Sequence, residues 1–414
     1  MTNEVKNVPE LRFPEFSEEW EDNLVGNIFE FKNGLNKGKE YFGYGIPIVN
    51  FKDVFHNRGI KSEYLNGKVD VSEKELQNYS VRKGDVFFTR TSEIIEEIGY
   101  PTVMMDEIPK AVFSGFVLRA RPKKNSKLVD DKFKRYVFFT YSFRKEMITK
   151  SSITTRALTS GTAINKMKVI YPTSIEEQNK IGDFFRKLDR QIELEEQKLS
   201  LLEEQKKGYM QKIFYQELRF KDENGNNYPE WEEKKLGNLI SEISIKTKTN
   251  NQYTLLSSTK NGLVSQEEYF RKQIGSKDNT GYKILKLNQM VISPQNLWLG
   301  NINFNEQFNI GIVSPSYRVF ELNTTFYLPF AKNILRSARY IYEYSQASEQ
   351  GASVVRRNLN IDLFNDIKIN LPIIEEQEKI GNFFSEIDKI IEKQSQKIDG
   401  LKSRKKGFLQ KMFV

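Results

Sequence analysis

Polar side chains that could read nucleic-acid bases gather in several segments of this chain. Arg, Asn, Gln, Lys, Ser and Thr hydrogen-bond to base edges, while Lys and Arg also contact phosphates. In the first half of the chain the candidate DNA-binding residues are Lys32, Asn33, Lys37, Lys52, Arg58, Arg90, Thr91, Ser92, Thr154, Thr155 and Arg156. In the second half they are Ser258, Thr259, Lys260, Asn261, Gln295, Asn296, Arg356, Arg357 and Asn358. The alternative for each of these residues is an ordinary place on an exposed loop.

The sequence lacks the patterns of familiar catalytic and cofactor sites. It contains no cysteine, which excludes disulfides, thiolate zinc sites and cysteine nucleophiles. Its single histidine, His56, argues against a histidine metal site or a Ser-His-Asp triad. The nearest match to a phosphate-binding loop, between Gly34 and Glu40, has the wrong spacing, and no G-x-G-x-x-G turn occurs. We therefore predict no catalytic, cofactor-binding or metal site in this chain.

Length and charge suggest a two-domain protein with a polyanionic partner. A chain of 414 residues exceeds one core, and 38% hydrophobic with 13% aromatic residues is enough to form stable cores. The net charge of +9 favours nucleic acid as a partner, although many lysine-rich proteins carry such a charge without one. No signal peptide and no apolar run of about 20 residues is present, so we expect a cytoplasmic protein without a membrane partner.

One long segment occurs twice. Ile175–Phe214 aligns without a gap to Ile374–Phe413, and about half of the aligned positions are identical. A shorter echo opens each half, where the Glu-Leu-Arg-Phe sequence at Glu10–Phe13 recurs at Glu217–Phe220. The chain therefore divides into a first domain at 1–171, a first long helix at 172–215, a second domain at 216–371 and a second long helix at 372–414.

Each repeated segment has the apolar spacing of a long helix. Ser174 with Glu177 fits a capping box, a cap that the second copy lacks. Apolar residues alternate in steps of three and four, as in a coiled coil, and we predict that they form an inter-helix seam. Its residues are Ile181, Phe185, Leu188, Ile192, Leu199, Leu202, Ile380, Phe384, Ile387, Ile391, Ile398 and Leu401. If the helices are antiparallel, the polar seam positions would pair Glu195 with Lys405 and Gln394 with Lys206.

The two bodies between these segments share no obvious identity and have the pattern of mixed α and β structure. The predicted strands are Ile46–Asn50, Asp85–Thr89, Phe113–Leu118, Met290–Ser293 and Tyr317–Phe320. Helical spacing is present at Phe133–Met147 and Phe326–Tyr344. Polar clusters at Lys32–Gly38, Ser151–Gly161, Ser257–Gly262 and Ser348–Asn360 are predicted loops.

Taken together, these motifs resemble the specificity subunit of type I restriction–modification systems over the whole length of the chain. The resemblance rests on P-x-x-x-EEQ-x-KIG-x-FF at Pro172–Phe185 and its shorter-spaced partner at Pro372–Phe384. It also rests on the K-K-G-x-x-Q-K-x-F tails at Lys206–Phe214 and Lys405–Phe413, and on LRFPEF at Leu11–Phe16. The missing cap before the second helix is a departure that affects only where that helix starts.

This resemblance implies two mixed α/β target-recognition domains, at 1–171 and 216–371. They would be joined by two long antiparallel coiled-coil spacer helices, at 172–215 and 372–414, with pseudo-twofold symmetry. Each domain would read one half of a bipartite, asymmetric site in double-stranded DNA. Two modification subunits, which carry S-adenosylmethionine, would methylate adenine, and two restriction subunits would use ATP and Mg to translocate and cleave DNA. The chain itself would be a non-catalytic subunit without a cofactor.

Three other interpretations stay open at this point. The chain could be the specificity subunit of a related system whose partner is a fused nuclease and methyltransferase, which the sequence does not distinguish. It could be a coiled-coil scaffold without DNA binding, against which the basic charge and the polar segments argue. A self-contained nuclease built on carboxylates is the third, although most carboxylates here fall on helix faces.

Overall fold

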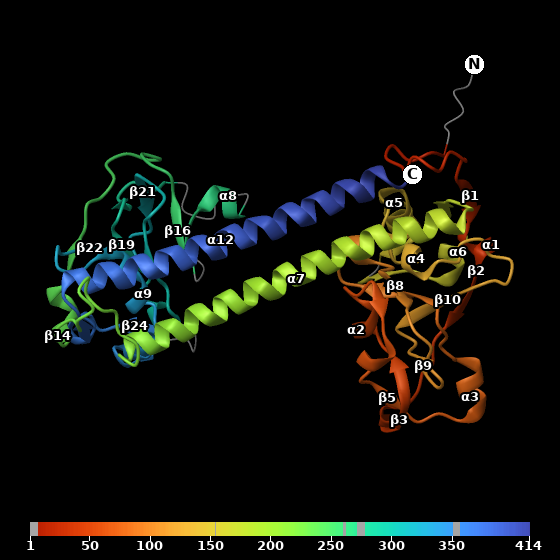
Figure 1. Cartoon of the computed structure of the whole chain (residues 1–414), viewed down its shortest axis with the longest axis horizontal. Coiled ribbons are helices and arrows are strands. Elements are labelled where there is room, and N and C mark those ends of the chain that lie inside the picture. Colours follow the sequence, from red (N-terminus) through yellow and green to blue (C-terminus); the bar gives the residue numbers. More distant parts are fainter. Residues whose placement is uncertain (1–6, 154, 260–261, 271–277, 351–356) are drawn as a thin grey trace, which may run out of the picture. The chain divides into compact units, whose positions relative to one another are not determined.

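The computed structural model describes residues 7–153, 155–259, 262–270, 278–350 and 357–414. Its contacts divide the chain into two compact units. Unit 1 comprises Met1–Glu196 and Gln396–Val414, and unit 2 comprises Gln197–Ser395. Each unit therefore combines one body with the beginning of its own repeated helix and the end of the other repeated helix (Figure 1).

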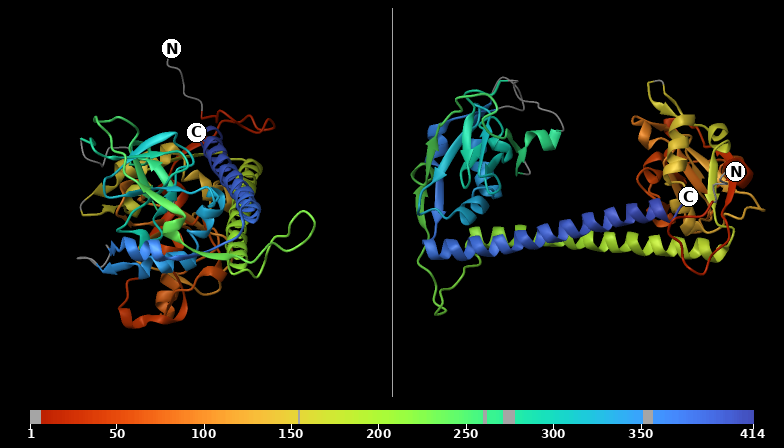
Figure 2. Two further views of the ribbon diagram at one scale, coloured as in Figure 1. Left: turned by 90° about the vertical axis from the view of Figure 1, so that its left-hand side faces the viewer. Right: turned by 90° about the horizontal axis from the view of Figure 1, so that it is seen from above.

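The two repeated segments are long helices, α7 (Ile175–Phe214) and α12 (Ile374–Lys411). Ser174 caps α7, because its hydroxyl accepts a hydrogen bond of 3.3 Å from the Glu177 backbone N–H. A capping box also needs the Glu177 carboxylate to accept a hydrogen bond from the Ser174 N–H. That part of the prediction was wrong, since the Glu177 carboxylate binds Arg12 and Trp20 instead. Within each unit the two helix segments run side by side in opposite directions (Figure 2).

Unit 1 is built on a five-stranded sheet in the order β2-β10-β6-β8-β4. The first four strands are antiparallel to their neighbours, and β4 is parallel to β8. Their bounds are β2 (Phe29–Asn33), β10 (Val117–Pro122), β6 (Val86–Thr89), β8 (Pro101–Met104) and β4 (Gly59–Ile60). Separate pairs and sheets are formed by β1 (Glu21–Leu24) with β13 (Lys168–Tyr171), by β3 (Phe42–Val49) with β5 (Lys68–Val69) and β9 (Val112–Phe113), and by β7 (Thr91–Ser92) with β11 (Ser152–Ile153) and β12 (Ala157–Leu158). The helices are α1 (Val25–Ile28), α2 (Phe51–Val54), α3 (Glu73–Asn78), α4 (Asp131–Val137), α5 (Tyr141–Lys150) and α6 (Gly161–Asn165).

Unit 2 repeats the central part of this plan with a four-stranded antiparallel sheet, β15-β22-β19-β20. The bounds are β15 (Ile240–Ile243), β22 (Arg318–Leu322), β19 (Met290–Ile292) and β20 (Ile302–Phe304). The remaining strands pair as β14 (Glu232–Lys235) with β25 (Lys368–Leu371), β16 (Leu256–Thr259) with β17 (Gly262–Ser265), β18 (Lys283–Lys286) with β21 (Ile310–Val313), and β23 (Ser348–Gln350) with β24 (Arg357–Leu359). The helices are α8 (Gln266–Phe270), α9 (Leu328–Ile334), α10 (Ala338–Gln346) and α11 (Ile361–Asp366).

The two bodies therefore share a sheet order that their sequences do not reveal. In both, the order of the first four strands is the same, two short helices follow the second strand of the order, and a hairpin and a final short helix lead to the strand before the long helix. What differs is the additional structure, which in unit 1 is β3, β5, β9, α2 and α3 and in unit 2 is β16, β17, β18 and β21. These additions form further hydrophobic clusters, two of which also include residues of the shared sheet.

Most predicted strands lie where they were expected, but both predicted helices are interrupted. The range Phe133–Met147 contains α4 and α5, separated at Thr140, whose backbone is extended and whose hydroxyl accepts a hydrogen bond from the Phe143 N–H. Ser337 separates α9 from α10 with a similar extended backbone. The predicted strand Phe113–Leu118 is likewise divided between β9 and β10.

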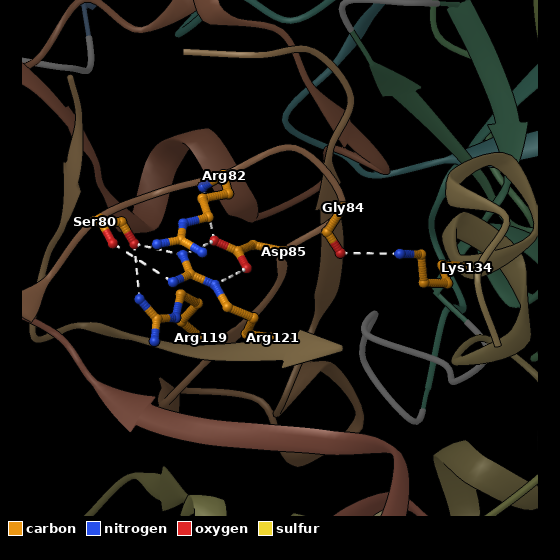
Figure 3. A network of polar contacts seen from close by, with 7 residues as sticks. All are labelled: Ser80, Arg82, Gly84, Asp85, Arg119, Arg121 and Lys134. Atoms are coloured by element: carbon orange, nitrogen blue, oxygen red, sulfur yellow. Dashed lines mark hydrogen bonds and ion pairs between the residues drawn. The ribbon is translucent and has the colours of Figure 1, made fainter. Parts of the chain in front are cut away.

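A polar network ties together the strands at the centre of unit 1 (Figure 3). Arg121 on β10 binds both carboxylate oxygens of Asp85, at 2.7 and 2.8 Å, and the Ser80 carbonyl accepts from both Arg119 and Arg121. Burial, with the neighbouring Arg121 charge, lowers the pKa of Arg119 to about 10. Gly84, at a φ of +83°, makes the turn before β6 that brings Asp85 into place.

Unit 2 has the same connection made from other residue types. Gln289 precedes β19 as Asp85 precedes β6, and its side chain accepts a hydrogen bond from the backbone N–H three residues earlier, as the Asp85 side chain also does. Its amide then donates to Glu321 on β22, at 2.9 Å, in place of the ion pair between Asp85 and Arg121. The same strand contact is therefore encoded by an Asp–Arg pair in one body and a Gln–Glu pair in the other.

Candidate nucleic-acid interface

In unit 1 the candidate residues near Thr91 and Arg156 come together from two distant segments. The loop after β6 carries β7, and β12 pairs with it in antiparallel register, with Thr91 opposite Leu158 and Ser92 opposite Ala157. Arg156, in the turn between β11 and β12, donates to the Glu93 carboxylate at 3.3 Å. The predicted loop Ser151–Gly161 is thus mainly a hairpin, because its ends pair across a short turn.

A cleft of about 430 Å³ lies against this hairpin. Thr91, Ser92 and Arg156 contribute to its lining, which is completed by Phe51, Phe55, Glu93, Ile94, Glu97 and Phe116. Arg90 is not among the lining residues, but its guanidinium donates to the Gly115 carbonyl at 3.0 Å and so supports the loop that carries Phe116. Thr155 is exposed in the hairpin turn. Polar, charged and aromatic groups therefore converge on one concave surface.

Unit 2 places its candidates in the equivalent position. The loop after β19 carries Gln295 and Asn296, and the β23–β24 hairpin lies beside it, since the Arg357 N–H donates to the Gln295 carbonyl at 3.3 Å. The Arg357 guanidinium stacks on the Trp298 ring at 4.5 Å from its centroid. Gln295 and Asn358 are exposed, and the Asn296 amide donates to the Ser293 hydroxyl. In both units a hairpin thus packs beside the loop between the third and fourth strands of the shared sheet order.

Other candidates in unit 1 are not among the residues that line that cleft. Lys32 is in β2, not in a loop, and its ammonium lies over the Tyr79 ring at 5.6 Å, while Asn33 ends the same strand. Lys37 donates to the Glu75 carboxylate at 2.8 Å, which lowers the pKa of Glu75 to about 2. Lys52 is exposed on α2. These positions remain candidates for phosphate contacts, and Lys52 is on the same helix as Phe51, which lines the cleft.

Two candidates have structural roles that the sequence did not indicate. Arg58 stacks on the Phe139 ring at 4.4 Å and on Tyr136, so its guanidinium points into the body. Ser258 is 6% exposed, and its hydroxyl bonds to both Asn301 and Asn303. The prediction of a loop at Ser257–Gly262 was wrong here, because Ser258 and Thr259 belong to β16. The candidates Thr154, Lys260, Asn261 and Arg356 lie outside the described residues.

Sequence reasoning missed a buried glutamate that fastens each body to its long helix. In unit 1, Glu177 is 1% exposed and accepts two hydrogen bonds from Arg12, at 2.7 and 2.8 Å, and a third from the Trp20 indole at 3.2 Å. In unit 2, Glu376 is fully buried and receives the equivalent bonds from Arg219 and from the Trp231 indole. We call these two arrangements the glutamate locks. The echoed Glu-Leu-Arg-Phe sequence, which contains Arg12 in one half and Arg219 in the other, was the signal that could have revealed them.

The next residues of the repeated motif complete the attachment. Gln178 accepts hydrogen bonds from two backbone N–H groups before α4 and donates to two carbonyls, and Gln377 makes a similar set in unit 2. A Cβ added at Gly182 would lie 2.7 Å from the Phe133 nitrogen, and one at Gly381 would lie 2.9 Å from the Phe330 nitrogen. Glycine at these positions lets the long helix approach the start of α4 or α9 closely. The motif therefore joins a helix to a recognition body.

The tails of the long helices enter the cores of the units. In unit 1, Phe413 is 5% exposed and packs against Trp20, Phe133 and Phe185. In unit 2, Phe214 packs in the same way against Phe330 and Phe384.

The predicted seam residues are all at least half-buried. Six of them are buried, namely Ile181, Phe185, Ile192, Ile380, Phe384 and Ile398. The other six are half-buried, namely Leu188, Leu199, Leu202, Ile387, Ile391 and Leu401.

The predicted register between the helices was wrong. In unit 1, Lys405 pairs with Asp189, while Glu195 pairs with Lys397. In unit 2, Lys206 pairs with Asp388 at 2.6 Å. Each lysine therefore meets a carboxylate six residues before the expected partner position, which is roughly 9 Å along a helix. Burial and the nearby Arg58 charge lower the pKa of Lys405, whereas the Asp189 carboxylate acts in the opposite direction.

Among the described residues, none of the helices is both long and apolar enough to cross a membrane. Across the same residues, no group of three or more His, Asp or Glu side chains is arranged to hold a metal ion.

Comparison with known proteins decides the family. The family described as "Type I restriction modification DNA specificity domain" matches residues 17–204 and 228–403, so each match covers one body and most of one long helix. This chain belongs to that family. It is a specificity subunit of a type I restriction–modification system, and its role is DNA sequence recognition.

Relatives and solved structures fit this assignment. The specificity subunit is 24% identical over 97% of its length to the putative MjaX specificity subunit of Methanocaldococcus jannaschii, of which it covers 94%. It is 29% identical over 49% of its length to the MjaVIII specificity subunit of the same organism, of which 46% is covered. Its fold resembles the S subunit from M. genitalium, with a TM-score of 0.53 and 15% identity over 98% of this chain and 99% of the other. It also resembles a chain from a structural study of type I R-M complex assembly, with a TM-score of 0.58 and 12% identity over 95% of this chain and 97% of the other.

Proposed function

We propose that this specificity subunit reads a bipartite, asymmetric site in double-stranded DNA, with one half read by each unit. The observation that carries the proposal is the equivalent placement of two chemically different polar surfaces. Thr91, Ser92 and Arg156 meet beside the β11–β12 hairpin, whereas Gln295 and Arg357 meet beside the β23–β24 hairpin. Equivalent surfaces suit one mode of approach to DNA, and different side chains suit different base sequences.

The same proposal assigns the chemistry to partner subunits. We place two modification subunits, with S-adenosylmethionine for adenine methylation, and two restriction subunits, with ATP and Mg for cleavage, around one copy of this chain. The chain itself acts as a non-catalytic reader in the cytoplasm and binds none of these cofactors. The duplicated frame supports two copies of each partner, because two similar units can each present similar contacts to one kind of subunit.

Exchange of one body tests the division of labour. Co-expression with the cognate modification subunit, followed by mapping of methylated adenines across a genome, is expected to give one bipartite motif. Replacing residues 30–171 with the body of another specificity subunit will then change one half of that motif and leave the other half unchanged. The proposal fails if both halves change, or if the unexchanged pair yields no bipartite motif.

Salt dependence separates a DNA reader from a coiled-coil scaffold. Neutralising phosphates releases counterions, so a protein with six or more phosphate contacts loses on the order of 10³-fold in affinity between 50 and 200 mM salt. We expect a loss of this size for the complex of the specificity and modification subunits on a duplex that contains the motif. Titration by fluorescence anisotropy over that range measures it. Affinity that does not change with salt would favour the scaffold.

A related system, in which one fused chain both cuts and methylates, is the second candidate for the partner. It predicts the same bipartite motif, so the mapping experiment does not separate it from a type I system. Purification of the assembled complex does, because the fused partner is one chain and the type I partners are two.

A further inference from the structure

The cleft in unit 1 has a chemistry that suits base edges better than the DNA backbone. It joins one cation, Arg156, with two carboxylates, Glu93 and Glu97, and with the apolar side chains of Phe116 and Ile94. Phe116 is 67% exposed and Ile94 is 53% exposed, which is high for large apolar residues. Carboxylates repel phosphates but accept hydrogen bonds from the amino groups of bases. The cleft therefore has no electrostatic preference for the backbone.

Arg156 and Glu93 present hydrogen-bond donors beside an acceptor. Their side chains are 63% and 80% exposed, and the Arg156 Nη2 lies 3.3 Å from the Glu93 Oε1. In the major groove a C·G pair offers the complementary pattern, since cytosine N4 donates and guanine N7 and O6 accept. Cytosine N4 and guanine O6 are joined by a hydrogen bond within the base pair and so lie about 2.9 Å apart. The spacing of the two side chains thus matches that of the two base groups.

Backbone hydrogen bonds hold both side chains to the central sheet. Thr159 N–H donates to the Arg90 carbonyl at 3.0 Å, which attaches the hairpin to the loop that carries Glu93. Arg90 N–H donates to the Phe116 carbonyl at 3.2 Å and so fixes the opposite wall. A reader must be positioned in this way, because a hydrogen bond to a base edge tolerates only small displacements.

We infer that Arg156 and Glu93 together read one C·G base pair in the half-site of unit 1. Arg156 donates to guanine and Glu93 accepts from cytosine N4, while Phe116 and Ile94 form apolar walls that exclude water from these contacts. The inference rests on the proposed function and adds to it the base pair and the residues. Unit 2 differs, because Arg357 stacks on Trp298 in the corresponding hairpin.

Methylation mapping with single substitutions tests this inference. Arg156→Ala and Glu93→Ala, each co-expressed with the modification subunit, will relax the motif at one C·G position, with discrimination there falling on the order of ten- to a hundred-fold. Glu93→Gln will admit adenine at that position, because a glutamine amide pairs with adenine N6 and N7. The affected half is the one that changes when residues 30–171 are exchanged.

Controls separate this inference from folding, assembly and the proposed function. Glu96→Ala, an exposed neighbour outside the cleft lining, will leave the motif unchanged. The inference is overturned if either alanine variant keeps the parental motif, if the unit 1 half contains no C·G pair, or if the variants lose binding to the modification subunit. Failure of the proposed function looks different, because the unsubstituted complex would then give no bipartite motif.

Discussion

Replacing Phe413 with alanine will destabilise unit 1 by about 3–5 kcal/mol, the usual cost of removing a buried phenyl ring. Phe413 is 5% exposed and lies at the far end of the sequence from Trp20, yet their ring centroids are 6.0 Å apart. It also contacts Phe133 and Phe185, at 5.4 and 5.8 Å. The lost ring leaves a cavity between the body and its long helix.

Tryptophan fluorescence can measure this effect in unit 1 alone. The chain has three tryptophans, and only Trp20 lies in unit 1, so the variant is made with Trp231 and Trp298 replaced by phenylalanine. Urea unfolding of Trp20 then reports the transition of that unit. Gln410→Ala, an exposed change three residues earlier at the end of α12, is the matched control and will alter the unfolding free energy by no more than about 0.5 kcal/mol. An unchanged midpoint in Phe413→Ala would contradict the packing described for unit 1.

Breaking one glutamate lock will lower the unfolding free energy of its own unit by about 3–5 kcal/mol, because the remaining partner of the ion pair loses its buried carboxylate. Glu177→Ala leaves Arg12 and the Trp20 indole of unit 1 without their shared carboxylate. Glu376→Ala does the same to Arg219 and the Trp231 indole of unit 2, where Arg219 keeps, among the described residues, only the exposed Glu230 carboxylate as an ion-pair partner. Denaturation of each variant, followed by a tryptophan in the unit concerned, measures the loss.

The neighbouring glutamate provides a close control for the lock. Glu176 has the same chemistry one residue away and is exposed, so Glu176→Ala will change the unfolding free energy by less than about 0.5 kcal/mol. The double variant Arg12→Met with Glu177→Met will recover part of the loss, because it removes both charges together. If Glu176→Ala and Glu177→Ala were equally destabilising, the lock would have no special role.

The sequence was sufficient to predict the repeated helices because their apolar spacing and their internal duplication are local signals. It was not sufficient to predict that the bodies share a sheet order. The contact made by Asp85 and Arg121 in unit 1 is made by Gln289 and Glu321 in unit 2, so no residue identity marks the equivalence. Only the backbone geometry that these pairs satisfy is common to the two.

The prediction of the register between the helices was wrong for a related reason. Heptad spacing specifies which face of a helix is apolar but not how far two helices slide along each other. In unit 1 that position is set by tertiary packing, where Phe413 enters the body and Lys405 meets Asp189.

The sequence was sufficient to predict only part of the candidate site. Residue type identified Thr91, Ser92 and Arg156, whereas Glu93 and Phe116 became visible only when the hairpin and the loop were brought together.

The division of each unit between distant segments has a consequence for synthesis on the ribosome. Unit 2 is one continuous stretch, Gln197–Ser395, whereas unit 1 also needs Gln396–Val414. The unit that is translated first is therefore completed last. At 5–20 residues per second, the first body waits roughly 10–40 s for its missing helix segment. Throughout that interval the apolar surfaces of Trp20, Phe133 and Phe185 that Phe413 later covers are open to the cell's chaperones.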